Sequence, residues 1–482
     1  MTPPAKPHRS SADRLQSLVW RKSAGTLGER TRRRVVVHLI PYLFFLYVLA
    51  YLDRANISVA KFGLEKTLAE GGLGFTNEII GFGFGIFFWG YWILEIPSTI
   101  SVLRWGARWV FVRILILWGL CCTLMGFIGT PLGDQLFGWW PLFHDNPHVS
   151  QFYVLRFLLG FFEGGFFPSV IVYLTLWFRP EDRAKAIATF MAAIPLSLMA
   201  GTPLSGLMLH LDWLELPGWR WIFILQGIAP VLAGIATPFF LPDRPAKAKW
   251  LSPEERDWLL GELAKEQELR QQHHGHLAWL NQAGIVLLLT LFYFGMNVSS
   301  YGLTNFMPAI VKSQTGYSDG VCTLLTGVAY LLGFVGMSIN GWHSDRQGER
   351  VWHVAVPLLC QSAALFLAAL VDGYAFAGVA VMLFLVGPFM YAHLPAFWPM
   401  PSMFLGTVAA ASAVGFINML GNLGGSLGPT MVGKVSEAGS SFAPALLRLA
   451  PFPLLSVACI LLVGWLRRKS WRVTATTHSN KE

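Results

Sequence analysis

Five charged residues lie within stretches of the chain that are otherwise apolar: Asp53, Arg54, Glu95, Arg156 and Glu163. A charge at the centre of a lipid bilayer costs roughly 2.5–3.5 kcal/mol on insertion scales, so such a residue usually faces a partner or a water-filled pathway. Paired arginines suit an anion, and a buried carboxylate can bind and release a proton. These residues predict a membrane protein that moves a small organic anion, or carboxylate, together with H⁺.

Arg54 and Arg156 are the predicted anion ligands. Arg54 lies 20 residues beyond Arg34, the last arginine of a basic tail, which places it in the outer half of the first apolar stretch. The stretch that contains Arg156 runs in the opposite direction from about residue 150, so Arg156 also falls in an outer half. Two guanidinium groups at similar depth can bind one carboxylate through paired hydrogen bonds.

Asp53 and Glu163 are the predicted proton carriers. Glu163 follows Arg156 by seven residues, which in a helix is ~10.5 Å along the axis on the same face. An anion that reaches the arginines would weaken their attraction for both carboxylates and so change how tightly these bind a proton. The alternative is that Asp53 with Arg54, and Arg156 with Glu163, only neutralise each other and lock helices together.

The composition indicates a membrane protein. Of the 482 residues, 54% are hydrophobic and 13% are charged, whereas roughly 25% are charged in a typical soluble domain. The chain also contains 20 Trp and 36 Phe residues, which suits contact with lipid and with the membrane interface. A soluble protein of this length would need charged residues to cover several cores. The charge content therefore excludes an ordinary soluble protein.

Twelve apolar stretches are long enough to span a bilayer of ~30 Å. An even number of spans places both termini on one side, and 28 of the 36 Lys and Arg residues fall on that side. This bias is the positive-inside signature, so we expect cytoplasmic termini rather than a nucleic-acid-binding surface. We expect no cleavable signal peptide before the first span, and interpret the Arg-rich tail as a cytoplasmic anchor for the first helix, with an organelle transit peptide as the alternative. The predicted spans lie near residues 35–60, 78–101, 109–128, 150–176, 184–209, 219–241, 281–311, 319–341, 352–371, 374–395, 402–434 and 444–466.

The chain divides into two similar halves. Basic inner loops follow the second and eighth stretches, and Gly/Pro-rich segments recur in the fifth and eleventh, as expected for a parallel repeat of six plus six helices with a site near the midplane. In the polar linker, Ser252 and Glu255 form a capping-box sequence, which predicts a helix. Its apolar stripe, at Trp258, Leu259 and Leu263, suits a position on the membrane surface or against the bundle. The predicted parts are a tail (1–34), a six-helix bundle (35–241), a linker (242–280), a second bundle (281–466) and a tail (467–482).

Several motifs resemble one family. The sequence Tyr-Leu-Asp-Arg-Ala-Asn-Ile-Ser-Val-Ala at residues 51–60 resembles the first-helix signature of the anion:cation symporter branch of the major facilitator superfamily. Further similarity, spread over roughly residues 30–465, is carried by segments 90–98, 155–168, 203–206 and 418–425. The resemblance implies an all-α fold of twelve transmembrane helices. It also implies, for many members, H⁺-coupled uptake of carboxylates such as sugar acids, tartrate or aromatic acids.

The resemblance also implies roles for individual residues. Arginines of the first and fourth helices would bind the anion, and Asp and Glu would carry protons. Tyr51 and Tyr91 would offer hydroxyl groups to the solute, and Tyr301, Asn305, Asn418 and Asn422 could do so from the second half; the alternative for each is a hydrogen bond between helices. Glu95 is expected to be a structural or gate carboxylate.

The expected gating residues are Arg108, Asp345 and Arg346. The first inner loop departs from the superfamily pattern, since Gly106-Ala107-Arg108 lacks the acidic residue that Asp345-Arg346 retains in the second half. We therefore expect gating ion pairs that differ between the halves.

The sequence is also compatible with two other functions. An exporter of drugs or metabolites would share the fold, and a nutrient receptor would retain the site without turnover. We find no sequence motif of an enzyme or a nucleotide site, and expect no metal and no cofactor besides the proton gradient. His273, His274 and His276 are read as a solvated linker, and the five cysteines as packing residues. We expect a monomer in the bacterial inner (plasma) membrane that binds the anion, H⁺ and lipid, but no nucleic acid.

Overall fold

The computed structural model describes residues 26–137, 142–271, 283–405, 407–437 and 441–479, and these residues are almost entirely helical. The first half contains α2 (Leu27–Leu64), α3 (Asn77–Trp105), α4 (Ala107–Met125), α5 (Pro131–Phe137), α6 (Pro147–Glu163), α7 (Phe166–Thr175), α8 (Pro180–Met191), α9 (Ala193–Met208) and α10 (Gly218–Phe240). A linker helix, α11 (Pro253–Gln271), follows, with short 3-10 turns at Leu68–Glu70, Trp213–Glu215 and Pro245–Lys247.

The second half begins with three long helices, α12 (Ala283–Thr315), α13 (Asp319–Gln347) and α14 (Val351–Leu370). The tenth predicted span is a series of short helices: α15 (Ala375–Val381), a π-helical turn (Met382–Val386), α16 (Gly387–Met390) and α17 (Leu394–Phe397). The chain continues through α18 (Met400–Leu405), α19 (Thr407–Gly421), α20 (Gly424–Glu437), α21 (Ala443–Leu449) and α22 (Pro451–Ser479).

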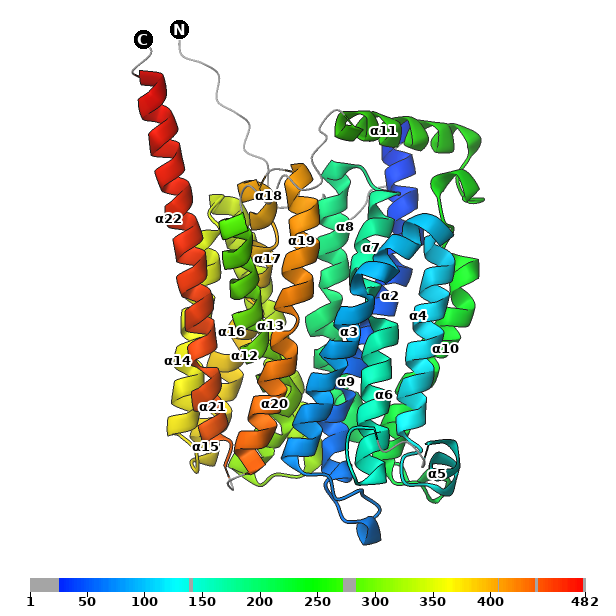
Figure 1. Cartoon of the computed structure of the whole chain (residues 1–482), viewed down its shortest axis with the longest axis vertical. Coiled ribbons are helices and arrows are strands. Elements are labelled where there is room, and N and C mark those ends of the chain that lie inside the picture. The colour runs from blue at the N-terminus through cyan, green and yellow to red at the C-terminus, as the bar shows by residue number, and fades with distance from the viewer. Residues whose placement is uncertain (1–25, 138–141, 272–282, 406, 438–440, 480–482) are drawn as a thin grey trace, which may run out of the picture.

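The prediction of twelve spans is confirmed. Among the described residues, eleven helical segments are long and apolar enough to cross a membrane. The remaining span is formed by α19 and α20, which are too short to count singly and follow each other with a break at Asn422-Leu423. Helices α2–α10 lie on one side of the molecule and α12–α22 on the other (Figure 1). We keep residues 35–241 and 281–466 as the proposed bounds of two bundles.

The fourth predicted span is not one continuous helix. It breaks between α6 and α7, where Gly165 adopts a left-handed conformation with a φ of 85°. A side chain at this position would be strained by the backbone and would also lie 2.5 Å from Cβ of Ser98 in α3. Glu163 is therefore the last residue of α6 and shares an unbroken helix with Arg156, and the break comes directly after it.

Glycines allow the helices to approach closely. A Cβ atom on Gly160 of α6 would lie 1.9 Å from the carbonyl oxygen of Phe87 in α3, an approach that only glycine permits.

We expect Gly160→Ala to separate α3 from α6 and to destabilise the fold by about 1–3 kcal/mol. Gly415→Ala is the matched control, since a Cβ atom there would meet no atom within 4 Å. Thermal unfolding of the detergent-purified variants measures the difference. A midpoint for Gly160→Ala equal to that of Gly415→Ala would contradict the close packing.

The linker helix α11 packs against the inner end of the first half. The predicted capping box is confirmed: Glu255 N–H donates to Oγ of Ser252 at 3.3 Å, and Ser252 N–H donates to Oε2 of Glu255 at 3.0 Å. Arg34 Nη1 of α2 lies 2.5 Å from Oε2 of Glu255, and Leu259 is buried. The apolar stripe of α11 thus faces the bundle. The linker histidines lie outside the described residues.

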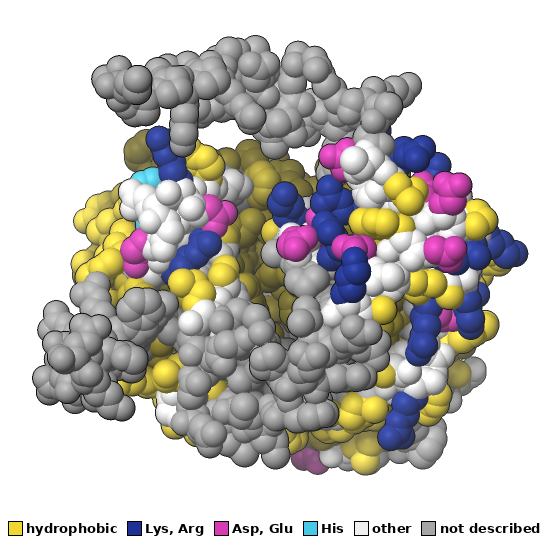
Figure 2. Space-filling view, turned by 90° about the horizontal axis from the view of Figure 1, so that it is seen from above, with side chains coloured by type: hydrophobic (Ala, Val, Ile, Leu, Met, Phe, Trp, Pro, Cys, Tyr) yellow, Lys and Arg dark blue, Asp and Glu magenta, His cyan; other side chains and the backbone are white. Residues whose placement is uncertain are grey.

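The two halves contact each other mainly through their outer parts. Lys312 of α12 lies over the ring of Phe62 in α2 at 4.7 Å, and Gly81 of α3 approaches the backbone of Pro429 in α20. Gly206 of α9 similarly packs on Thr323 of α13. Seen from the opposite end, where α11 lies, a hollow with hydrophobic side chains separates two groups of charged side chains (Figure 2). The contacts therefore close the outer end more tightly than the inner end.

Candidate functional site

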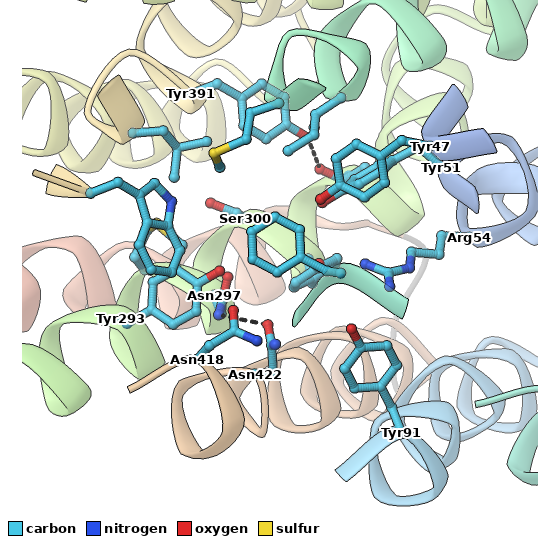
Figure 3. Close-up of a pocket in the computed structure, with 18 residues that line it drawn as sticks. Tyr47, Tyr51, Arg54, Tyr91, Tyr293, Asn297, Ser300, Tyr391, Asn418 and Asn422 are labelled. Atoms are coloured by element: carbon cyan, nitrogen blue, oxygen red, sulfur yellow. Dashed lines mark hydrogen bonds between the residues drawn. The ribbon is translucent and has the colours of Figure 1, made fainter. Parts of the chain in front are cut away.

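A cavity lies between the two halves and is lined by both of them (Figure 3). Its walls are mainly tyrosines, asparagines and hydroxyl groups, and Arg54 is the one charged residue among those that line it in the described part of the chain. The lining residues are Tyr47, Tyr51, Arg54, Tyr91, Phe167, Met191 and Ile194 from the first half, and Tyr293, Met296, Asn297, Ser300, Tyr301, Thr304, Tyr391, Leu394, Trp398, Asn418 and Asn422 from the second.

Arg54 is held at the cavity wall by a carboxylate behind it. Its Nε and Nη2 atoms lie 2.8 Å and 2.6 Å from Oε1 of Glu163 at the end of α6. The Arg54 side chain is 12% exposed, whereas that of Glu163 is fully buried. The guanidinium carbon also lies 5.2 Å from the ring centres of both Tyr51 and Tyr91. Part of the Arg54 charge thus stays available to a ligand, while Glu163 is shielded from the cavity.

Asp53 and Arg156 form a second charged group, which lies inside the first half. Asp53 is buried and accepts a hydrogen bond of 2.8 Å from Nδ2 of Asn56, whose amide also lies 3.4 Å from Sγ of Cys122. Arg156 is buried, and its Nε donates to the carbonyl oxygen of Gly83 at 3.1 Å. Asp53 and Arg156 attract each other electrostatically, without an ion pair within 4 Å in the described structure.

The pairing of the charged residues differs from both arrangements predicted from the sequence, namely two arginines that share one anion, and the pairs Asp53 with Arg54 and Arg156 with Glu163. Arg54 pairs with Glu163, and Arg156 is attracted mainly by Asp53 and less strongly by Glu163. Consecutive residues of a helix point about 100° apart, because a turn contains 3.6 residues. Arg54 therefore faces the cavity while Asp53 faces the interior of its own half. The two arginines do not meet at one position where a single carboxylate could bind both.

Of the eight residues predicted to bind substrate, six line the cavity: Tyr51, Arg54, Tyr91, Tyr301, Asn418 and Asn422. Arg156 and Asn305 do not line it; both are buried among helices.

Sequence reasoning missed a set of polar lining residues: Tyr47, Tyr293, Asn297, Ser300, Thr304 and Tyr391. For most of them, their helical spacing from a predicted site residue could have indicated that they line the cavity. Tyr47 precedes Tyr51 by four residues, and Tyr293 and Asn297 precede Tyr301 by eight and four, so each falls on the same helical face as a predicted residue.

Hydrogen bonds fix several lining side chains. Nδ2 of Asn297 donates to the carbonyl oxygen of Gly421 at 3.0 Å and to Oδ1 of Asn422 at 3.4 Å. The hydroxyl groups of Thr304 and Tyr391 lie 3.1 Å apart. These bonds hold the second-half wall in one arrangement.

The expected gating residues have partners in their own halves. The backbone N–H of Arg108 donates to Oδ1 of Asp243 at 3.0 Å, and its Nε donates to the carbonyl oxygen of Leu241. Asp345 pairs with Arg350 at 2.6 Å, and Arg346 lies over the ring of Trp342. Asp243, just beyond α10, thus supplies a carboxylate to the first inner loop, whose sequence contains none.

We expect Arg156→Gln to destabilise the protein by about 3 kcal/mol, because Asp53 would remain buried beside no positive charge. Adding Asp53→Asn should recover most of this loss, since neither charge then remains. Denaturant unfolding in detergent measures both variants. Full stability of Arg156→Gln alone, or no recovery in the double variant, would contradict the pairing.

Comparison with known proteins identifies the family. Residues 43–429 match the sequence profile described as Major Facilitator Superfamily. The chain belongs to the major facilitator superfamily. A protein of Agrobacterium vitis named "Putative tartrate transporter" is 36% identical over 457 residues, which cover 94% of this chain and 95% of the relative. A "Quinolone resistance transporter" of Acinetobacter baumannii is 35% identical over 86% of this chain and 90% of its own length.

Solved structures agree with this assignment. A crystal structure of a D-xylose-proton symporter has a TM-score of 0.63 and 17% identity, covering 89% of this chain and 96% of that chain. At this identity the likeness shows the fold alone. The family and its bacterial relatives confirm the predictions of a multi-pass membrane transporter that resembles organic-anion transporters, consistent with the bacterial inner membrane. Members of this superfamily are transporters and not enzymes.

Proposed function

We propose that this protein is a secondary active transporter that takes up a small organic anion together with H⁺ by alternating access. The observation that carries the proposal is the pairing of Arg54, the charged residue of the cavity wall, with the buried carboxylate of Glu163. One cation is thereby shared between an internal carboxylate and whatever anion enters the cavity.

The coupling follows from competition for Arg54. A carboxylate that enters the cavity would attract the guanidinium and loosen its contact with Glu163. Glu163 would then be a buried anion with less compensation, which is unfavourable unless the carboxyl group binds a proton. Anion and proton would thus bind together, and the loaded site would carry no additional net charge through the membrane. Asp53 is the second proposed proton carrier, acting through Arg156.

The remaining cavity wall supports a hydroxylated carboxylate as the substrate. Tyrosine, asparagine and serine side chains offer hydrogen bonds from several directions, and the relative named for tartrate transport is similar over nearly the whole chain. One lining arginine matches one carboxylate group. We therefore propose an anion with one carboxylate at Arg54 and hydroxyl groups, or a second polar end, toward α12 and α19.

Uptake by proteoliposomes tests this function. The panel contains sugar acids, tartrate, aromatic acids and dicarboxylates, each measured with and without an inward H⁺ gradient. Accumulation of one class that depends on the gradient is expected. Movement driven only outward would instead favour the exporter suggested by the second relative. Binding without turnover of any anion would indicate a receptor.

A further inference from the structure

Glu95 is a buried carboxylate outside the Arg54–Glu163 pair. It lies on α3, one helical turn beyond Tyr91, and its residue is 2% exposed. Oε1 accepts a hydrogen bond of 2.6 Å from Nδ2 of Asn418 on α19, so the contact joins the two halves. Oε2 has no hydrogen-bond partner among the described residues.

This bond decides which atom Asn418 presents to the cavity. Nδ2 of Asn418 is the donor of this bond and Oε1 of Glu95 is the acceptor, so the amide nitrogen of Asn418 faces Glu95. The other end of the amide, the acceptor Oδ1, is then left for the cavity that Asn418 lines. Without a fixed partner, the amide could turn and offer its nitrogen instead.

Asn422, four residues later, has the opposite polarity. Its Oδ1 accepts from Nδ2 of Asn297, which leaves the amide nitrogen of Asn422 as a donor. Asn422 follows the last residue of α19, and its N–H donates to the carbonyl oxygen of Asn418 at 2.9 Å. Both side chains lie at the same part of the cavity wall (Figure 3). An acceptor and a donor are therefore presented side by side.

We propose that Asn418 and Asn422 form a subsite for a substrate hydroxyl group, and that Glu95 is the positioning residue that sets its polarity. A hydroxyl group donates one hydrogen bond and accepts others, so it can donate to Asn418 and accept from Asn422. A methylene group at the same place leaves both amides unpaired. The inference rests on the proposed function and adds a criterion for its substrate: hydroxy acids are preferred to the corresponding deoxy acids.

The test measures uptake of two series of anions, each losing hydroxyl groups stepwise: glycerate, lactate and propionate, and tartrate, malate and succinate. In the wild type, kcat/KM for the hydroxylated member should exceed that of its deoxy analogue by about tenfold or more. Glu95→Gln should reduce this ratio about tenfold, mainly through a higher KM for the hydroxylated anion. Loss of the Glu95 charge alone would change uptake of all anions equally and leave the ratio unchanged.

A swapped pair provides the matched control. In E95Q/N418D the amide introduced at position 95 donates to the carboxylate introduced at position 418, whose second oxygen remains an acceptor, and the total charge is unchanged. The ratio should return toward the wild-type value, although uptake of every anion should fall, because the carboxylate at position 418 lines the cavity. If the swapped pair does not fold, N418A serves instead: it should lower the ratio, and E95Q added to it should lower the ratio no further.

Three results would overturn the inference: a wild type that does not distinguish the hydroxylated anions from their deoxy analogues, an unchanged ratio in E95Q, or additive effects of E95Q and N418A.

Failure of the proposed function can be distinguished from failure of this inference. If no anion is transported, the same ratios are measured as binding by tryptophan fluorescence, since Trp398 lines the cavity. Discrimination in binding that is lost in E95Q would support the subsite while rejecting transport, and no binding at all would reject both.

Discussion

Replacing Arg54 with glutamine should lower anion uptake by about 100-fold. The glutamine cannot attract a carboxylate, and no other lining residue of the described cavity carries a positive charge. Removing one member of a buried, hydrogen-bonded charge pair typically costs 2–5 kcal/mol, which corresponds to about 30-fold or more in affinity. Arg54→Lys should retain part of the uptake, because it keeps the charge but loses the two-pronged contact with Glu163.

Initial uptake rates over a range of anion concentrations measure this effect. Arg179→Gln is the control, since Arg179 lies beyond α7 and pairs with Asp182 and Glu262 away from the cavity. It should transport like the wild type. Wild-type uptake by Arg54→Gln would contradict the assignment of the anion site.

Glu163→Gln should abolish accumulation driven by a pH gradient while leaving anion exchange in place. Glutamine has nearly the shape of the glutamic acid side chain but cannot gain or lose a proton. It resembles the protonated state, in which Arg54 is free to bind the anion, so counterflow of labelled against unlabelled anion should continue. Net uptake should fall to the level seen without a gradient.

Both assays are run on the same proteoliposomes. Glu181→Gln is the matched control, because Glu181 lies at the inner surface with a side chain that is 76% exposed. It should retain gradient-driven accumulation. Loss of exchange in folded Glu163→Gln would show that Glu163 is needed for more than proton coupling, and retained accumulation would exclude it as the proton carrier.

Much of the fold could be predicted because lipid imposes a strong rule on sequence. Backbone groups in a bilayer must be bonded within a helix, so each span is a long apolar stretch. The span at residues 219–241 thus corresponds closely to α10 at Gly218–Phe240. Breaks within the spans were harder to predict from the sequence. The glycine that separates α6 from α7 resembles in sequence the glycines that only allow close packing, whereas in the structure it has a left-handed backbone and leaves no room for a side chain beside Ser98 of α3.

The charged residues of the site were visible in the sequence, but their pairing was not. Charges in apolar stretches are conspicuous, and so Arg54 and Glu163 could be named. Which arginine contacts which carboxylate depends on how α2 is rotated about its axis relative to α6, and this rotation cannot be read from the sequence. The contact of Glu95 with Asn418 joins residues 323 positions apart on opposite halves. Nothing in local spacing connects them, so it required the assembled cavity.

The most direct test of the central claim is the pH inside proteoliposomes that contain a trapped pH-sensitive dye. Adding the transported anion outside, with no pH gradient imposed, should acidify the lumen, because each anion brings a proton with it. The signal should be absent in Arg54→Gln, in Glu163→Gln and in protein-free liposomes, which control for leakage of the undissociated acid. Anion entry without a change in lumenal pH, or with alkalinisation, would contradict symport with H⁺.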